Sequence, residues 1–144
     1  MDTIKIARLN TTAILPTRKN PQDAGLDIYA CQETLIPAHT HGITPTGITM
    51  EIPQGYVAIL KPKGRNNHLL GAGVVDAGYQ GEILVKIFNP TNEPLLIRSG
   101  DAIGQILIIP ILTPAIEEVS MESIHIQPST RGDSGGIVEQ HQNQ

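Results

Sequence analysis

The glycine-rich segment at residues 70–82, Leu-Gly-Ala-Gly-Val-Val-Asp-Ala-Gly-Tyr-Gln-Gly-Glu, is the part of the chain best suited to chemistry. Its aspartate, Asp76, follows two valines, and a carboxylate in an apolar setting can serve as a general base. Glycines on both sides leave backbone N–H and C=O groups open to a flat base. The pattern predicts a strand-turn-strand hairpin. It leaves two roles open for Asp76, a catalytic base and a turn residue that caps the hairpin.

Two further segments place a charged side chain beside glycine. Asp27 lies in the run at residues 24–30, Ala-Gly-Leu-Asp-Ile-Tyr-Ala, either as an exposed strand residue or as part of a site. Arg131 opens a glycine-rich run at residues 131–136, whose N–H groups and guanidinium could wrap phosphates. This run lacks the GxxxxGK[ST] spacing of a Walker loop, which excludes that family.

Metal clusters and disulfides have little support in the sequence. His39 and His41 lie two residues apart with no third ligand nearby, which favours a solvated turn over a metal pair. The single cysteine, Cys31, excludes an internal disulfide and a CxxC metal cluster.

The charge balance excludes some partners. Ten Lys and Arg against 14 Asp and Glu give a net charge of −4, without the basic surface that duplex binding needs. We therefore expect no nucleic-acid partner. No stretch is long and apolar enough to span a membrane or to form a secretion signal, so we expect a protein that is cytoplasmic or otherwise intracellular, without a membrane partner.

The composition predicts an all-β fold. Hydrophobic residues make up 40% of the 144-residue chain and charged residues only 17%, and isoleucine is the dominant aliphatic residue. β-Branched side chains fit a pleated sheet better than a helix. Turn residues recur about every ten positions, as in a sandwich or barrel. The expected strands lie at residues 4–9, 26–29, 34–36, 42–43, 47–52, 56–60, 82–89, 95–97 and 102–111. In the strand at 82–89, Ile83, Val85 and Ile87 alternate with Glu82, Leu84, Lys86 and Phe88, which predicts two different faces.

Two details of this expectation are specific. The last strand, at residues 102–111, is a nearly continuous apolar run, which predicts burial of both its faces. The only helix expected is one turn at residues 115–121.

The C-terminal segment differs in composition from the rest of the chain. We expect one β domain at residues 1–126 and a C-terminal arm at residues 127–144, which is rich in Ser, Gly and Gln. This composition is typical of a flexible tail. The alternative is an arm that becomes ordered on a ligand or over the active site of a neighbouring subunit.

In chain order, these segments resemble the trimeric dUTP diphosphatase (dUTPase) family. The resemblance runs from about Ile4 to Gly136. AGLDIYA at residues 24–30 is similar to the family's first motif, GVVDAGYQGE at 73–82 to the third, GDAIGQILIIP at 100–110 to the fourth, and RGDSGG at 131–136 to the start of the fifth.

The resemblance implies a distorted jelly-roll or β-barrel-like subunit in a homotrimer, with each active site built from three chains. It implies hydrolysis of dUTP to dUMP and pyrophosphate, in which Asp76 activates a water for attack on the α-phosphorus. Tyr79 would pack under the deoxyribose and exclude a 2′-hydroxyl. Backbone groups at Leu70, Gly73, Val74 and Val75 would recognise uracil.

The phosphates would be bound by a second set of residues, which the resemblance places at Lys63, Gly64, Arg65, Gln105 and Arg131. It also implies a Mg²⁺ cofactor that the triphosphate holds without direct protein ligands. Asp27 would lie in the outer shell of that ion and would orient the cation of the second motif.

Two motifs depart from the family pattern. The second motif has Lys63-Gly64-Arg65-Asn66 where an Arg-Ser-Ser or Arg-Ser-Gly run is usual, so the residue that contacts phosphate stays open among these four. The fifth motif lacks the aromatic residue that stacks on the base. These departures leave a catalytically weakened nucleotide-binding or regulatory protein of the same fold as the alternative, and a dCTP deaminase-like relative as a third interpretation.

Overall fold

The computed structural model describes residues 1–63, 69–70, 73–128 and 130. The chain forms two compact units, Met1–Leu112 and Thr113–Gln144. All the strands lie in the first unit: β1 (Lys5–Arg8), β2 (Leu26–Tyr29), β3 (Thr34–Ile36), β4 (His41–Pro45), β5 (Ile48–Glu51), β6 (Tyr56–Lys61), β7 (Leu69–Leu70), β8 (Gly73–Val75), β9 (Leu84–Phe88), β10 (Leu95–Ile97) and β11 (Ala102–Pro110). No α-helix occurs in the described ranges, which confirms the all-β prediction.

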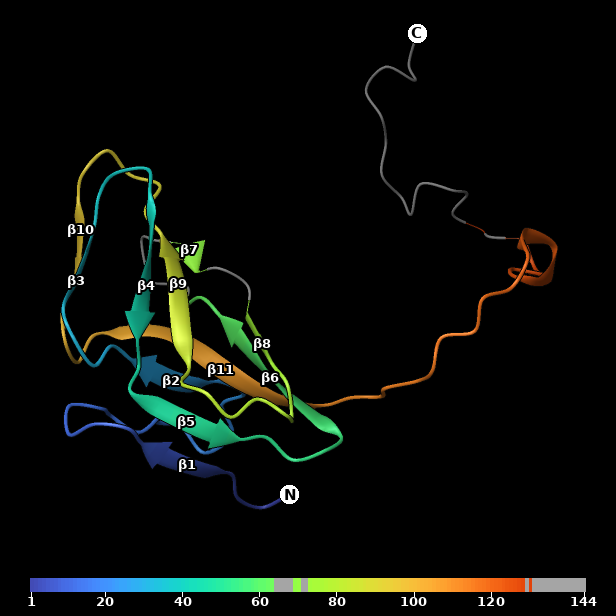
Figure 1. The fold of residues 1–144 in the computed structure, drawn as a ribbon, viewed down its shortest axis with the longest axis horizontal. Helices are drawn as coiled ribbons and strands as arrows, with labels where there is room; N and C mark the ends of the chain where they lie inside the picture. The colour runs from blue at the N-terminus through green and yellow to red at the C-terminus, as the bar shows by residue number, and fades with distance from the viewer. Residues whose placement is uncertain (64–68, 71–72, 129, 131–144) are drawn as a thin grey trace, which may run out of the picture. The chain divides into compact units, whose positions relative to one another are not determined.

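The strands form four small sheets (Figure 1). The largest has the order β2-β11-β6-β8, with antiparallel pairing throughout, and β11 runs through its middle. A three-stranded sheet has the order β4-β9-β7, and the pairs β1-β5 and β10-β3 complete the unit. Neighbours in these sheets are often distant in sequence. The fold therefore depends on long-range pairing, and it brings β2, β6 and β11 side by side.

The core is aliphatic and mainly isoleucine. The largest fully buried hydrophobic side chains are Ile28, Ile36, Ile48, Ile52, Ile83, Val85, Ile87, Ile103 and Ile106. Most of them lie on strands, where a branched Cβ packs well against its neighbours. On β9 the predicted alternation is confirmed, since Val85 and Ile87 are fully buried while Leu84 and Phe88 are 48% and 38% exposed.

Two expectations about the elements are wrong in detail. β11 is not buried on both faces along its whole length, because Ile103 and Ile106 are fully buried while Ile109 is 38% exposed. The second half of β11 pairs with β6 alone, since Leu26, the first residue of β2, lies opposite Ile106. The helical turn is a 3-10 turn at Met121–Ser123, not at residues 115–121. It begins after Ser120, and serine is a favoured residue at a helix start.

The second unit has little regular structure in its described part. Its apolar side chains lie on the surface, with Ile116 98% exposed and Met121 81% exposed. No helix in the described ranges is long and apolar enough to cross a membrane.

Candidate active site

Two pockets in the first unit collect most of the residues that the sequence singled out. One, here called the polar pocket, has a volume of about 300 Å³ and is lined by Lys19, Asp23, Ala24, Gly25, Asp27, Lys63 and Gln105. The other, here called the apolar pocket, has a volume of about 190 Å³ and is lined by Leu60, Gly73, Val74, Val75, Tyr79, Glu82, Ile83 and Leu84.

The polar pocket is built by strand register. On the four-stranded sheet Gln105 of β11 lies opposite Asp27 of β2 on one side and opposite Lys61 of β6 on the other. Residues directly opposite in an antiparallel pair share a face of the sheet. Lys63 follows two residues after Lys61. The register therefore brings the first motif, the fourth motif and the start of the second motif together.

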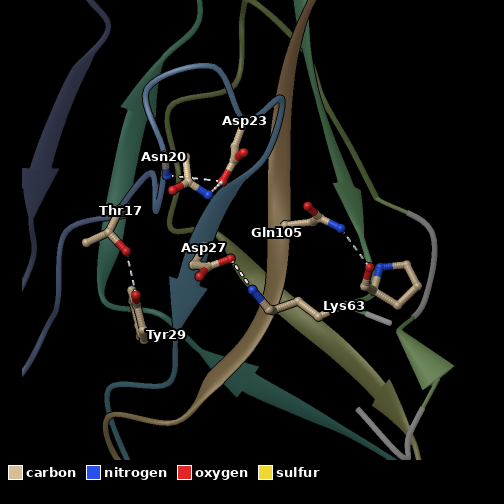
Figure 2. A network of polar contacts seen from close by, with 8 residues as sticks. Thr17, Asn20, Asp23, Asp27, Tyr29, Lys63 and Gln105 are labelled. Carbon is tan, nitrogen blue, oxygen red and sulfur yellow. Dashed lines mark hydrogen bonds and ion pairs between the residues drawn. The ribbon is translucent and has the colours of Figure 1, made fainter. Parts of the chain in front are cut away.

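An ion pair links the first and second motifs. The Lys63 ammonium donates a hydrogen bond to the Asp27 carboxylate (Figure 2), and the two side chains are 21% and 20% exposed. Such partial burial weakens the screening of the pair by water. The contact supports the prediction that Asp27 orients the cation of the second motif.

Gln105 fixes the segment that leads to Lys63. Its side-chain amide donates to the Pro62 carbonyl over 3.0 Å (Figure 2). The amide oxygen of Gln105 fills the space beside Gly25, where an added Cβ would lie only 2.1 Å from it. Glycine is therefore required at residue 25 for Gln105 to keep this position.

The loop before β2 is held by its own polar contacts. Thr17 exchanges two backbone hydrogen bonds with Asp27, at 3.1 and 2.7 Å. The Asp23 carboxylate accepts from the backbone N–H and the side-chain amide of Asn20, at 3.1 and 3.0 Å (Figure 2). Arg18 donates to the Asp23 carbonyl over 2.8 Å. These contacts give the wall of the polar pocket a defined shape.

The apolar pocket lies at an edge of the four-stranded sheet. β8 is the last strand in the order β2-β11-β6-β8, so one side of it has no strand partner within the described sheets. The Val75 side chain points inward and is 7% exposed, whereas Val74 is 64% exposed. An added Cβ at Gly73 would lie 2.5 Å from Leu60, so the close packing of β8 on β6 requires this glycine.

The predicted hairpin is wrong in its strand pairing. β7 pairs with β9, while β8 pairs with β6, so these two strands belong to different sheets. Residues 73–82, here called the Asp76 segment, begin in the four-stranded sheet and lead to β9 in the three-stranded one. Strand partners depend on contacts between distant residues, which the local glycine pattern does not encode.

The surroundings of Asp76 also differ from the expectation. Asp76 is exposed in the single chain and is not enclosed by the valines that precede it. Its carbonyl accepts the Tyr79 N–H over 3.0 Å, which closes a tight turn. Asp76 is thus a turn residue through its backbone, and its carboxylate is open to a ligand.

Tyr79 is held by groups close to it in sequence. Its hydroxyl donates to the Glu82 carbonyl over 2.5 Å, and its side chain is 42% exposed. The ring lies against Gly81, where an added Cβ would come within 2.6 Å of the Tyr79 hydroxyl. The side chain therefore folds back over its own segment and forms part of the wall of the apolar pocket.

β5 and the residues before it fix the end of the Asp76 segment. The Thr49 hydroxyl donates to the Gly81 carbonyl over 2.8 Å. The Glu82 carboxylate accepts the Gly47 N–H over 3.0 Å. Thr46 donates to the Ile83 carbonyl over 2.5 Å in a buried contact. Sequence analysis missed Thr46 and Thr49, because nothing in their local sequence indicates a contact more than 30 residues away.

The other predicted residues can be placed only in part. Gly64, Arg65 and Arg131 lie outside the described residues, and so does Asn66. Leu70 is described as a residue of β7 by its backbone. Lys63 is the one member of its motif that the structure describes in the pocket. Lys19 and Asp23 also line it, and the sequence analysis assigned no role to either.

The described residues contain no group of three or more His, Cys, Asp and Glu side chains that could hold a metal ion. The polar pocket offers the carboxylates of Asp23 and Asp27 beside the ammonium groups of Lys19 and Lys63. Mg²⁺ is commonly bound by one or two carboxylates together with the phosphates of a substrate. This donor set fits a metal that arrives with a phosphate ligand.

The two pockets suit ligand groups of different chemical character. The free edge of β8 can offer backbone donors and acceptors to a planar polar group, with apolar side chains around it. The polar pocket can bind an anion through its cations and the Gln105 amide. A nucleotide combines both chemical characters.

Comparison with known proteins gives a consistent result. The family model described as dUTPase matches residues 11–135 of this chain. The chain is 35% identical over 138 residues to the deoxyuridine 5′-triphosphate nucleotidohydrolase of Yarrowia lipolytica, a match that covers 93% of this chain and 86% of that protein. It is 36% identical over 141 residues to the protein of the same name from Mycolicibacterium vanbaalenii, with 92% of each chain covered.

Solved structures share the fold. The dUTPase of Staphylococcus bacteriophage 80alpha with dUPNHPP superposes with a TM-score of 0.83 at 24% identity, and the match covers 94% of this chain and 96% of that one. The dUTPase from phage phi11 of S. aureus superposes with a TM-score of 0.78 at 25% identity, covering 85% of this chain and 100% of that one. At this level of identity the likeness concerns the fold.

Proposed function

The chain belongs to the dUTPase family, and we propose from this premise that it hydrolyses dUTP to dUMP and pyrophosphate. The observation that carries the proposal is the edge of β8 that has no strand partner among the described residues. It lies beside a small apolar pocket, with Tyr79 in the pocket wall and Asp76 exposed directly after β8. These features fit a reaction in which a base is recognised by the backbone and a water is activated nearby.

Uracil recognition follows from the free edge of β8. Backbone N–H and C=O groups of Gly73, Val74 and Val75, together with Leu70, would match the donors and acceptors on the edge of uracil. Cytosine presents the opposite pattern at position 4, so it would leave polar groups unpaired. Close packing of the glycine-rich segment around the base would also exclude the methyl group of thymine.

Tyr79 is proposed to distinguish deoxyribose from ribose. A ring packed under the sugar leaves no space for a 2′-hydroxyl. The hydrogen bond from the Tyr79 hydroxyl to the Glu82 carbonyl supports this role, because it limits the freedom of the ring.

Asp76 is proposed as the general base. Its exposed carboxylate would accept a proton from the water that attacks the α-phosphorus, and the leaving group would be pyrophosphate. A positioned base of this kind contributes about 10²- to 10⁴-fold in rate. Electrostatic stabilisation of the phosphates would supply most of the remaining rate acceleration.

The polar pocket is proposed to bind the triphosphate. Lys63 and Gln105 lie there, and Gly64, Arg65 and Arg131 complete the proposed phosphate-binding set. Asp27 would contact the metal through water and would hold Lys63 in place through their ion pair. When bound, Mg²⁺ would neutralise charge on the phosphate oxygens. A structural Mg(II) ion is described for a mutant of the phage phi11 dUTPase.

The active form is proposed to be a homotrimer. Asp76 is exposed in the single chain, and a general base gains from exclusion of water. A neighbouring subunit could provide the missing cover. Val74 and Leu84, both at the apolar pocket, are 64% and 48% exposed and offer an apolar surface for that contact. The arm at residues 127–144 is proposed to become ordered over the site of a neighbouring subunit.

Pyrophosphate release tests the proposal. The purified chain is incubated with Mg²⁺ and dUTP, dCTP, dTTP or UTP in separate reactions. We expect release from dUTP above the other three, and a loss of about 10²-fold or more in kcat for Asp76→Asn. If dUTP gives no release and Asp76→Asn behaves as the unsubstituted chain does, the enzyme assignment is wrong and a nucleotide-binding protein of the same fold takes its place.

A further inference from the structure

We propose that Lys19 binds the pyrophosphate part of the substrate, an inference that rests on the proposed function. Lys19 lines the polar pocket with Lys63 and Gln105. It lies outside the motifs that carry the family resemblance, and the sequence assigns no role to it.

Lys63 is not a free cation. Its ammonium donates to the Asp27 carboxylate, so much of its charge is already compensated before a ligand binds. Among the described residues the only other ion pair is Lys5–Glu51. Within that part of the chain Lys19 therefore has no carboxylate within ion-pairing distance, and it is the cation of the polar pocket that can meet an incoming anion.

Binding of an anion in the polar pocket needs the Lys19 ammonium, because the pocket also contains two carboxylates. Asp23 and Asp27 offset the charges of Lys19 and Lys63, so the four side chains sum to zero. Without Lys19 the sum would be negative, and the pocket would repel a polyphosphate that still carries net negative charge with Mg²⁺ bound. Lys63 carries an ammonium where the family pattern has a guanidinium fork, which increases the need for a second cation.

The loop that carries Lys19 is shaped before a ligand arrives. Thr17, two residues before it, is paired to Asp27 through two backbone hydrogen bonds. Asn20, the next residue, is bound through its N–H and its amide to the Asp23 carboxylate (Figure 2). The Lys19 backbone is thus fixed on both sides, so little conformational freedom beyond that of its own side chain is lost on binding.

The leaving part of the substrate is the best match for this pocket. Asp76 is proposed to act at the α-phosphorus, so the β- and γ-phosphates leave together as pyrophosphate. Pyrophosphate carries more negative charge than the single phosphate of dUMP, and it therefore suits the ammonium of Lys19 in the polar pocket better than dUMP does. An ammonium binds phosphate as a point charge with three donors, without a demand for planar geometry.

The test measures binding of inorganic pyrophosphate and of dUMP, each with Mg²⁺, by isothermal titration calorimetry on the full chain. We expect Lys19→Met to weaken pyrophosphate binding about tenfold, or about 1.4 kcal/mol, and to leave dUMP binding unchanged. Lys19→Arg keeps the charge and should retain most of the affinity. Lys86→Met, on the exposed face of β9, is the matched control and should bind both ligands as the unsubstituted chain does.

The inference is overturned if Lys19→Met binds pyrophosphate within twofold of the affinity of the unsubstituted chain, or if the unsubstituted chain does not bind pyrophosphate at all. It is also overturned if Lys86→Met loses as much pyrophosphate affinity as Lys19→Met, or if Lys19→Met loses as much affinity for dUMP as for pyrophosphate. The binding test can fail or succeed independently of the hydrolysis test of the proposed function. A chain that binds pyrophosphate through Lys19 and yet does not hydrolyse dUTP would keep this inference as a phosphate site and remove the enzyme assignment.

Discussion

Asp27 and Asp76 have the same side chain in two different settings. Asp27 lies on β2, is 20% exposed at its side chain and has its carboxylate bound by Lys63. That carboxylate is suited to holding a cation in place. Asp76 is exposed at a turn, and the turn is closed by its carbonyl and not by its side chain. Its carboxylate stays accessible to a water, which suits it for proton transfer.

A substitution at Gly25 would test whether the position of the Gln105 side chain matters for activity. In Gly25→Ala the new Cβ would lie 2.1 Å from the Gln105 amide oxygen, so that flexible side chain must move. The move would break its 3.0 Å bond to the Pro62 carbonyl. Loss of such a bond costs about 0.5–1.5 kcal/mol of folding free energy. We expect a small loss of stability in thermal melts and a roughly tenfold loss in kcat/KM for dUTP, which corresponds to about 1.4 kcal/mol.

A double substitution provides the control for this prediction. If Gly25→Ala acts through Gln105, then adding it to Gln105→Ala should reduce kcat/KM little further. Additive losses would show that Gly25→Ala disturbs the loop before β2 by another route, and the role given to Gln105 would lose its support.

At the scale of elements, β5 and its preceding turn hold the Asp76 segment in register. Thr46, Gly47 and Thr49 contact the Ile83 carbonyl, the Glu82 carboxylate and the Gly81 carbonyl respectively. Gly47 has φ of +69°, a conformation that glycine adopts without strain. These contacts come from one short stretch, residues 46–49, so the shape of the apolar pocket depends on residues that supply none of its lining.

Gly81→Ala should loosen sugar selection. Its Cβ would lie 2.6 Å from the Tyr79 hydroxyl and 2.8 Å from the ring carbon that bears it, so the ring must leave its place. We expect the ratio of kcat/KM for dUTP over UTP to fall about tenfold or more, because the ring no longer blocks the 2′-position. Steady-state kinetics with both nucleotides measures this ratio.

Gly78→Ala is the matched control. It adds the same methyl group three residues earlier in the Asp76 segment, and no atom lies within 4 Å of the added Cβ. The ratio should therefore stay close to that of the unsubstituted chain. An equal fall for both variants, or none for Gly81→Ala, would show that Tyr79 is not positioned by its contact with Gly81.

Local patterns predicted single elements well and their partners poorly. The alternation around Val85 and Ile87 predicted a strand with one buried face, because period-two burial is a property of consecutive residues. The assignment of β7 and β8 to different sheets was not predicted, since it depends on β9 and β6 far away in sequence. The Asp27–Lys63 contact follows from register and was expected only through the family resemblance.

At the scale of the whole molecule, the single chain leaves Asp76 and several apolar side chains exposed. Val74 and Leu84, which both line the apolar pocket, are 64% and 48% exposed although they are hydrophobic. Neighbouring exposed side chains of this size are typical of a surface that meets another protein. Neither the exposure of Asp76 nor this apolar surface could be read from composition, because both depend on which residues the fold leaves uncovered.

The C-terminal arm should matter for turnover more than for stability. Every residue of the described core cluster, and of the hydrophobic side chains packed on it, lies at or before Ile108. Truncation after Gln127 would remove Arg131 and its glycine-rich run and leave this core intact. We expect the midpoint of thermal unfolding to shift by no more than about 2–4 °C, equivalent to about 1 kcal/mol, while kcat/KM for dUTP falls at least tenfold.

Truncation after Gly136 keeps Arg131 and serves as the control, with turnover close to that of the full chain. If the shorter chain turns over dUTP as fast as the full one, the arm is not part of the active site and phosphate binding depends on the polar pocket alone.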